Sequence, residues 1–306
     1  MSQYSENNFI KLLRDFCNQH NILSAATLSL CTEIKNAIRS ELQKIYNKNN
    51  NAIVSEYLIR TLKQRSNPFE GRNWAKSYIS FAIPIDIIPD LNFTMLEDQN
   101  CEKYLAAYSK KLDYHIFCNK ILKEFFLLLN QNQNSNINYE ICVDTKPVPE
   151  KILAKFAKLG KIGYNNCLIC NQRSDFFIAS AFTSIELPQI TLNDNPIFEC
   201  ENCKMCLKNC PTGALAENKF FPQKCISYIT IEKKGELSIE ERKLIGSQIF
   251  GCDICTFSCP KSHKIPNPKI NKDCLLALNE KEFREIFKKS PILYAGLKKL
   301  KRNASE

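Results

Sequence analysis

Apolar side chains recur at helical spacing in three stretches of the chain. Residues 5–65 predict helices, because apolar positions such as Phe9, Leu13 and Phe16 fall three or four residues apart. The pattern from Leu105 to Phe125 predicts one helix of about 25 residues, or two helices with a kink. The stretch 275–302 predicts a basic amphipathic helix.

Shorter stretches have strand character. Ile79, Phe81 and Ile83 alternate with their neighbours, and Pro84 either ends this strand or confines it to a sheet edge. The predicted strands are 76–86, 139–144, 167–170 and 176–182, and a helix is expected at 150–158. This mixture predicts an α+β chain with an α/β-type domain at 1–190, a cysteine-rich domain at 191–270 and a basic helical tail at 271–306.

Composition fits a globular protein with a sizeable core. Of 306 residues, 44% are hydrophobic and 24% are charged, and no run of apolar residues is long enough to span a membrane. The first residues lack the features of a signal peptide, so a cytoplasmic protein without a membrane partner is expected. The net charge of +10 is compatible with a nucleic-acid partner, and equally with ordinary solubility.

Cysteine is the residue that carries the chemistry. Half of the 16 cysteines fall in the segment CENCKMCLKNCP at 200–211, the segment CDICTFSCP at 252–260, and a single position between them. In a reducing compartment such clusters indicate metal or redox chemistry more often than disulfides. The spacing C-x2-C-x2-C-x3-C-P is typical of proteins with two [4Fe–4S] clusters, in which the fourth cysteine binds the other cluster.

The rule that the fourth cysteine of each motif binds the other cluster divides the eight cysteines into two sets. Set one is Cys200, Cys203, Cys206 and Cys259; set two is Cys210, Cys225, Cys252 and Cys255. Zinc is the alternative, but the triple CxxC spacing and the two Cys-Pro endings favour iron–sulfur clusters. The other eight cysteines are predicted to be ordinary core thiols. Two adjacent clusters transfer single electrons, and the 190 residues before them indicate a separate site that accepts those electrons.

Five motifs together resemble one known family, the epoxyqueuosine reductases. The motifs are DYH (113–115), CVDTKPVPEK (142–151), KLGKIGYN (158–165), CISYITIE (225–232) and FGCDICTFSCP (250–260). The resemblance begins near RSNP (65–68) and extends to the RN pair near the C-terminus. Three positions depart from the family pattern, namely Ala107, Tyr164 and Arg173, and these put individual cofactor or substrate contacts in question.

The resemblance implies an oxidoreductase that binds cobalamin beside a ferredoxin-like module with two [4Fe–4S] clusters. It implies reduction of the epoxide of epoxyqueuosine at the wobble position of tRNA, giving queuosine. Electrons would come from an external low-potential donor of the ferredoxin or flavodoxin type, and the protein would act as a monomer. Two alternatives stay open: a ferredoxin-like electron-transfer subunit, and a related corrinoid reductase acting on a small molecule.

The resemblance also assigns roles to residues outside the cysteines. Asp144 takes the position of the family's acid, and it would need burial to raise its pKa; the alternative is a helix N-cap. Arg65, Ser227, Asp253 and Asp144 are expected to contact cobalamin. His115 is expected to line the pocket rather than bind cobalt. A basic face for tRNA phosphates is predicted from Lys288, Lys289, Lys298, Lys299, Lys301 and Arg302.

Overall fold

A four-stranded antiparallel sheet forms the centre of the larger half of the molecule. The computed structural model describes residues 6–48, 56–93, 100, 103–133, 136–193, 200, 203–217 and 219–305. The strand order is β1-β2-β7-β4, and every neighbouring pair is antiparallel. The strands are β1 (Ser24–Ser29), β2 (Ser77–Pro84), β7 (Phe176–Thr183) and β4 (Tyr139–Cys142).

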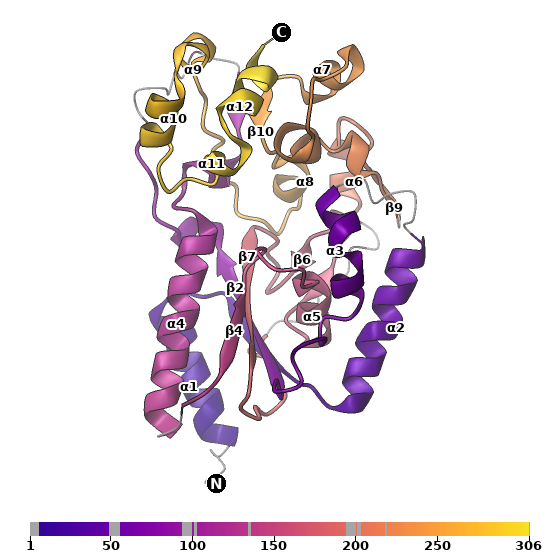
Figure 1. Cartoon of the computed structure of the whole chain (residues 1–306), viewed down its shortest axis with the longest axis vertical. Coiled ribbons are helices and arrows are strands. Elements are labelled where there is room, and N and C mark those ends of the chain that lie inside the picture. The colour runs from indigo at the N-terminus through magenta and orange to yellow at the C-terminus, as the bar shows by residue number, and fades with distance from the viewer. Residues whose placement is uncertain are drawn as a thin grey trace.

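Helices cover both faces of this sheet, so every residue of the central strand β2 is buried (Figure 1). On one face α1 (Glu6–Gln19) and α4 (Tyr114–Gln133) pack Phe16, Phe125 and their neighbours against Phe81. On the other face α2 (Thr32–Lys48) and α5 (Glu150–Phe156) lie against the sheet, with Tyr78 and Phe182 in that core, and α3 (Glu56–Ser66) packs beside α2. Side chains that alternate along β2 therefore pack into two separate cores, one on each face of the sheet.

The mixed α+β class is confirmed, but several predicted elements are corrected. The sheet is antiparallel, so the stricter α/β description is wrong. The helical stretch at 5–65 contains β1, whose small residues carry no clear periodicity. The helix predicted from Leu105 begins only at Tyr114, because β3 (Tyr104–Leu105) and a 3-10 turn at Ala107–Lys110 precede it. Part of the predicted turn at 47–51 and the first residues of the helix predicted from Ile53 lie outside the described residues.

The cysteine-rich segment and the C-terminal tail form the second half, above the sheet in Figure 1. Its remaining elements are β5 (Lys161–Ile162) and β6 (Leu168–Ile169) at the junction, then α6 (Met205–Asn209), β8 (Leu215–Ala216), β9 (Lys219–Phe220), the 3-10 turn Pro222–Lys224, the π-helix Tyr228–Glu232, α7 (Ile239–Ile245), β10 (Gln248–Phe250) and α8 (Ile254–Phe257). Here β10 pairs in parallel with β3, so residues far apart in the sequence share one core.

The tail is four short helices rather than the single one predicted. They are α9 (Lys272–Ala277), α10 (Glu280–Ile286), α11 (Ile292–Ala295) and α12 (Leu297–Ala304). Asn271 and Asn279 cap the first two, and Gly296, at φ 79°, makes the break before the last. The helical periodicity predicted for this stretch is correct, but the N-caps and the break at Gly296 divide the stretch into separate helices. Across the described residues, no helix is both long and apolar enough to cross a bilayer.

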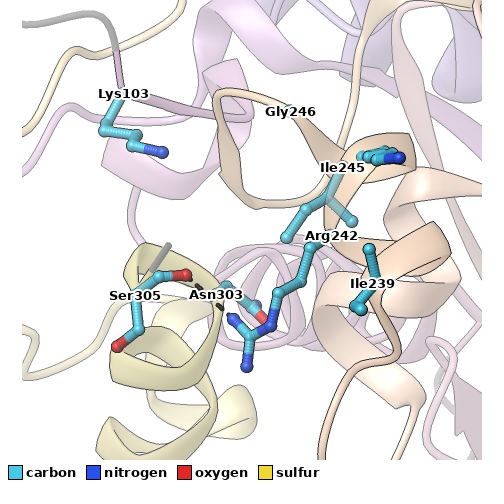
Figure 2. Close-up of a pocket in the computed structure, with 8 residues that line it drawn as sticks. Lys103, Ile239, Arg242, Ile245, Gly246, Asn303 and Ser305 are labelled. Carbon is cyan, nitrogen blue, oxygen red and sulfur yellow. Dashed lines mark hydrogen bonds between the residues drawn. The ribbon is translucent and has the colours of Figure 1, made fainter.

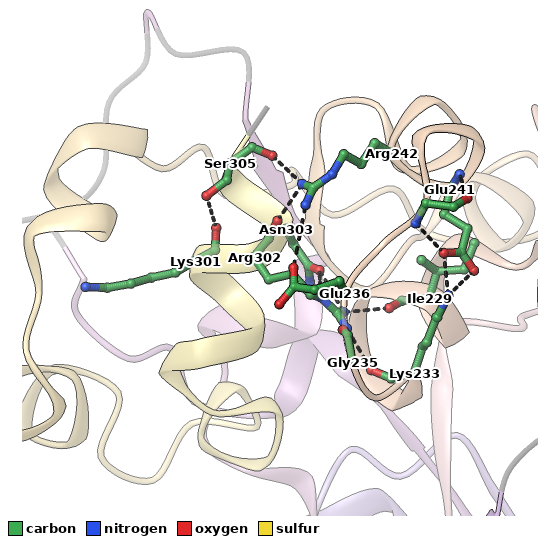
Figure 3. Close-up of polar contacts among 11 residues, drawn as sticks. Ile229, Lys233, Gly235, Glu236, Glu241, Arg242, Lys301, Arg302, Asn303 and Ser305 are labelled. Atoms are coloured by element: carbon green, nitrogen blue, oxygen red, sulfur yellow. Dashed lines mark hydrogen bonds and ion pairs between the residues drawn. The ribbon is translucent and has the colours of Figure 1, made fainter.

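The Arg302–Asn303 pair joins the tail to the loops that carry the cysteines (Figure 3). The Arg302 guanidinium, 7% exposed, donates to the carbonyls of Ile229, Lys233 and Gly235. The Asn303 amide donates to the carbonyls of Thr230 and Ile249, both at 2.8 Å. The π-helix and β10 follow Cys225 and precede Cys252, so this pair fixes the position of both.

The predicted basic face is therefore smaller than expected. Arg302 is buried in this network, and the Lys299 ammonium donates to the Ile231 carbonyl. Lys288, Lys289 and Lys298 are exposed and remain available for a polyanion.

Replacing Asn303 by Ala should destabilise the half that carries the cysteines. Two buried carbonyls lose their donors, so the free energy of unfolding should fall by about 2 kcal/mol. Urea unfolding measures this change, and Lys298→Ala on the exposed side of the same helix is the control, expected within about 0.5 kcal/mol of the parent. Equal stability of the two variants would contradict the role given to Asn303.

Candidate redox site

The four cysteines of set one line a single pocket. Cys200, Cys203, Cys206 and Cys259 face it together with Tyr164, Asn165, Ile169 and Lys204. Gly163 lies directly beside it, because a Cβ there would stand 2.6 Å from Ile169 Cδ1 and 3.2 Å from Cys200 Sγ. A side chain at this position would have to displace the end of Ile169 and would crowd Cys200, so the segment 160–167 lies close against set one.

The cysteines of set two are also brought together. The charges of Cys225 and Cys210 both act on Cys252, and those of Cys252 and Cys225 both act on Cys255. Burial, together with the neighbouring Asp253, Cys225 and Cys210, raises the pKa of the Cys252 thiol to about 12 in the absence of a metal. The division inferred from sequence spacing thus agrees with which cysteines are neighbours in space.

Backbone N–H groups point at several of these sulfur atoms. Those of Ser227 and Tyr228 donate to Cys225. Burial raises the pKa of Cys210, but the Thr212 hydroxyl and the N–H groups of Leu215, Thr212 and Ala214 outweigh it, so the pKa is lowered overall. Such hydrogen bonds stabilise thiolates and tune the potential of an iron–sulfur cluster. Within the described residues, no three His, Cys, Asp or Glu side chains have the spacing of a single-ion site; the thiolates of a four-iron cluster bind separate irons.

The remaining cysteines do not all behave as predicted. Cys17, Cys118, Cys142 and Cys170 are buried, as expected of core thiols. The expectation is wrong for Cys31 and Cys274, which are exposed because they flank helix starts at the surface. Cys167 is half-buried between the two sets, since the charges of both Cys225 and Cys259 act on it. Cys101 lies outside the described residues.

Asp144 lies on the loop that follows β4, at the end of the sheet nearer the cysteines. It is exposed, contrary to the burial expected of it, and its φ of 51° places it in the left-handed region, which Asp tolerates better than most residues. The Tyr114 hydroxyl donates to Asp144 Oδ2 at 3.0 Å. The alternative role of Asp144, that of a helix N-cap, does not apply to α5, because the N-cap residue of that helix is Pro149.

Glu150 is the residue that the sequence interpretation missed. It is 9% exposed at the start of α5, and its Oε1 accepts the backbone N–H of Asp144 at 2.8 Å. Burial, and next the Asp144 charge, raises the pKa of Glu150 to about 8. A signal was present, because Glu150 shares a helix face with buried Leu153 and Ala154 at i+3 and i+4.

A half-exposed aromatic wall stands beside this carboxyl pair. Tyr114 stacks on Phe177 with ring centroids 4.0 Å apart, and Tyr108 packs edge-on to both. The charges of Asp144 and Asp253 both act on Tyr108, and burial and these charges raise its pKa. Tyr108 therefore marks where the sheet end and the cysteine-bearing half meet.

The other predicted cofactor contacts lie on both sides of this junction. Arg65 ends α3 and donates to the Val148 carbonyl, with its charge acting on Glu150. Ser227 precedes the π-helix beside Cys225. Asp253 is buried, and its Oδ2 accepts the Ala107 N–H at 2.6 Å and the Asn267 amide at 2.7 Å. The structure thus gives Asp253 a structural role, and its contact with a cofactor stays a prediction.

The residues that depart from the family pattern also have defined places. The backbone N–H of Ala107 donates to the Asp253 carboxylate, and Tyr164 lines the set-one pocket. Arg173 forms ion pairs with Asp175 and Asp86. His115 Nδ1 lies 2.7 Å from an Asp113 carboxylate oxygen and its ring stacks on Tyr114; its pocket-lining role stays a prediction.

A larger pocket, about 540 Å³, lies away from both cysteine sets (Figure 2). Arg242 points across it toward the tail, where its guanidinium donates to the carbonyls of Arg302 and Ser305. None of the predicted site residues lines it, so the candidate site is the junction around Tyr108 and the two cysteine sets.

Comparison with known proteins agrees with this assembly of parts. A family model described as a 4Fe–4S double cluster binding domain matches residues 199–262, and one described as epoxyqueuosine reductase QueG, DUF1730, matches residues 65–145. These two models fall on the cysteine-rich half and on the sheet that carries Asp144.

Curated relatives cover more of the chain. An epoxyqueuosine reductase of Cyclobacterium marinum is 31% identical over 262 residues, covering 82% of each chain. One from Pseudomonas aeruginosa is 33% identical over 217 residues, covering 65% of this chain and 58% of the relative. The chain belongs to the epoxyqueuosine reductase family.

Solved structures show the same fold. An epoxyqueuosine reductase from Streptococcus thermophilus has a TM-score of 0.76 at 24% identity, covering 97% of this chain and 80% of that one. An epoxyqueuosine reductase crystallised with an epoxyqueuosine-modified tRNA stem loop has a TM-score of 0.79 at 24% identity, covering 98% and 80%.

Cysteine-to-serine variants should test the two sets. Cys206→Ser and Cys259→Ser, 53 residues apart in sequence, should each lower the iron content by about half, and the double variant should lose no more iron than either alone. Cys225→Ser should remove the other cluster, and buried Cys170→Ser should keep both. Iron analysis with electron paramagnetic resonance of the reduced protein measures this. Additive losses for Cys206 and Cys259 would contradict the pairing.

Proposed function

We propose that the chain is an epoxyqueuosine reductase, which converts the epoxide of epoxyqueuosine at the tRNA wobble position to the alkene of queuosine. The observation that carries this proposal is the junction itself: a carboxyl pair and an aromatic wall stand at the sheet end, facing the half that holds two sets of four cysteines. Family membership supports the same conclusion.

The chemistry of the step defines what the site must supply. Conversion of an epoxide to an alkene breaks two C–O bonds, forms a C=C bond, consumes two electrons and two protons, and releases water. The two [4Fe–4S] clusters would supply electrons one at a time, received from an external low-potential donor of the ferredoxin or flavodoxin type. Asp144, exposed at the mouth of the site, would give a proton to the departing oxygen.

The residues present also fit cobalamin. A corrin ring is flat and largely apolar, with polar amide arms. Tyr108, Tyr114 and Phe177 leave half-exposed aromatic surface at the junction, and the Asp144 carboxylate accepts the Tyr114 hydroxyl there. Arg65 and Ser227 would provide further polar contacts. When bound there, cobalamin would supply a low-valent metal able to pass electrons to the substrate. The role of the chain would be to hold the ring and to position Asp144.

The wider assignments follow from this function. We assign residues 1–190 to cobalamin binding, 191–270 to the ferredoxin-like module and 271–306 to the tail that contacts RNA. The protein would act as a monomer in the cytoplasm, where tRNA is modified. Donor electrons would enter at the set-one pocket, and the exposure of the neighbouring Met205 supports this assignment.

Asp144→Asn should keep both clusters and bound cobalamin while turnover falls about 100-fold or more, because the amide keeps the left-handed loop but has no proton to give. Conversion of epoxyqueuosine in a tRNA stem loop, followed by nucleoside mass analysis, measures turnover. Exposed Glu186→Gln is the control. Normal turnover in the Asp144 variant would remove this residue from the mechanism.

The exposed lysines of the tail should contribute phosphate contacts. Changing Lys288, Lys289 and Lys298 to Gln should weaken tRNA binding and reduce the slope of log affinity against log salt by about 2. A triple control changes Lys11, Lys44 and Lys123, which are exposed on α1, α2 and α4. Fluorescence anisotropy over a salt series measures the affinity and the salt slope of each triple variant. Equal slopes in the two triples would place the RNA elsewhere.

A further inference from the structure

The loop that carries Asp144 is short, and its centre is open to water. Val143 before it and Val148 after it are buried. Asp144 and Thr145 are exposed, and Lys146 is half-buried. Asp144 has a φ of 51°, a conformation that a residue with a side chain keeps only where its surroundings hold it. Contacts on both sides of Asp144 are therefore needed to keep its carboxylate in one place.

Two contacts hold Asp144 itself, and a third holds the loop just beyond it. The Tyr114 hydroxyl donates to Asp144 Oδ2 at 3.0 Å, and the Asp144 N–H donates to Glu150 Oε1 at 2.8 Å. Two positions further along, the Lys146 ammonium donates to Glu140 Oε1 at 2.7 Å. This ion pair ties the far side of the exposed turn back to strand β4.

Glu140 is a rigid anchor for that ion pair. Its backbone belongs to β4, opposite Phe182 of β7. The Arg72 guanidinium donates to both of its oxygens, from Nε to Oε2 at 2.7 Å and from Nη2 to Oε1 at 2.8 Å, which is a bidentate pair. Arg72 also donates to the Pro68 carbonyl at 2.9 Å and lies over the Phe182 ring, 5.0 Å from its centroid. The anchor thus joins the segment before β2 to the sheet.

Charge and burial define how strong this contact is. Hydrogen bonds from Arg72 and Lys146 lower the pKa of Glu140 against the opposing effect of its burial, so the carboxylate stays ionised at neutral pH. The Arg72 side chain is 13% exposed, whereas that of Lys146 is 37% exposed. The Arg72–Glu140 pair therefore belongs to the fixed framework. The Lys146–Glu140 pair is a weaker contact at its edge, expected to affect the position of the loop rather than the fold.

We propose that Lys146 is a positioning residue for Asp144, and that the Arg72–Glu140–Lys146 tether holds the Asp144 carboxylate where it meets the substrate. The proposal rests on the proposed function, because that function assigns Asp144 to the epoxide oxygen. Loss of the tether leaves Asp144 and the cofactor contacts unchanged in chemistry. It lowers the fraction of molecules in which Asp144 is in position, so it acts on turnover and not on binding.

The first readout is hydrogen exchange of the holoenzyme, which does not depend on activity. Lys146→Met removes the ammonium but keeps a chain of similar length, so peptides that span residues 143–148 should exchange about two- to fivefold faster. Lys146→Arg restores a donor to Glu140 and should return the exchange to the parent rate. Lys123→Met, at an exposed lysine on α4, is the matched control and should leave the exchange of this loop unchanged.

The second readout is the steady-state reduction of an epoxyqueuosine tRNA stem loop, with reduced methyl viologen as electron donor. Lys146→Met should lower kcat about three- to tenfold at unchanged KM and cobalamin content, and Lys146→Arg should recover kcat. Glu140→Gln should lower kcat as well. The double variant should lose no more than Glu140→Gln alone, because both changes act through one contact.

The outcomes separate the tether from the proposed function. Loop exchange that is the same in Lys146→Met and the parent overturns the proposal while queuosine formation by the parent keeps the proposed function. A raised KM at unchanged kcat also overturns it, because Lys146 is then an RNA contact. If the parent forms no queuosine but its loop exchange depends on Lys146, the proposed function fails and the tether stands.

Discussion

The close approach of cysteines from distant parts of the chain is the contact on which the rest of this structure depends. Cys259 lies beside the loop of Cys200 to Cys206, and Cys210 lies beside Cys225 and Cys252, as two clusters with crossed ligands would require. Neither set can form until residues 200–260 have folded back on themselves. The Arg302–Asn303 pair stabilises that fold from outside, by binding carbonyls in the segments next to Cys225 and Cys252.

The same constraint determines how the sheet half and the cysteine-bearing half meet. The segment 160–167 leaves the sheet domain and covers set one, with Gly163 against Cys200. Hydrogen bonds between Ser174 and Ser262, and from the His263 N–H to Asp175, hold the other edge of this junction. Tyr108 lies where the two halves meet, since the charges of Asp144 on one half and Asp253 on the other both act on it.

The sequence predicts those parts of the fold and the site that depend on the spacing of residues along the chain. The cysteine sets follow from ligand geometry, which is local and strict, and the long apolar patterns of α1 and α2 follow from helical periodicity. Predictions failed where tertiary contacts decide the outcome. Residues 104–110 have helical spacing, but pairing with β10, more than 140 residues away, makes Tyr104 and Leu105 extended, and only a 3-10 turn follows at Ala107–Lys110. Its sequence position suggests that Arg302 is a surface cation, yet the side chain is buried and donates to four acceptors. Glu150 was missed because a single carboxyl at a helix start normally serves the helix dipole, and only the fold shows that it is buried under Asp144.

In the proposed reaction, electrons from the two cysteine sets and a proton from Asp144 remove one oxygen atom from a nucleoside in tRNA. An electron count tests this reaction: holoenzyme and epoxyqueuosine tRNA are titrated anaerobically with a known reductant, and the nucleosides are identified by mass spectrometry. One queuosine is expected for every two electrons beyond those that the clusters and cobalamin retain. Fully reduced clusters with epoxyqueuosine left intact would contradict it.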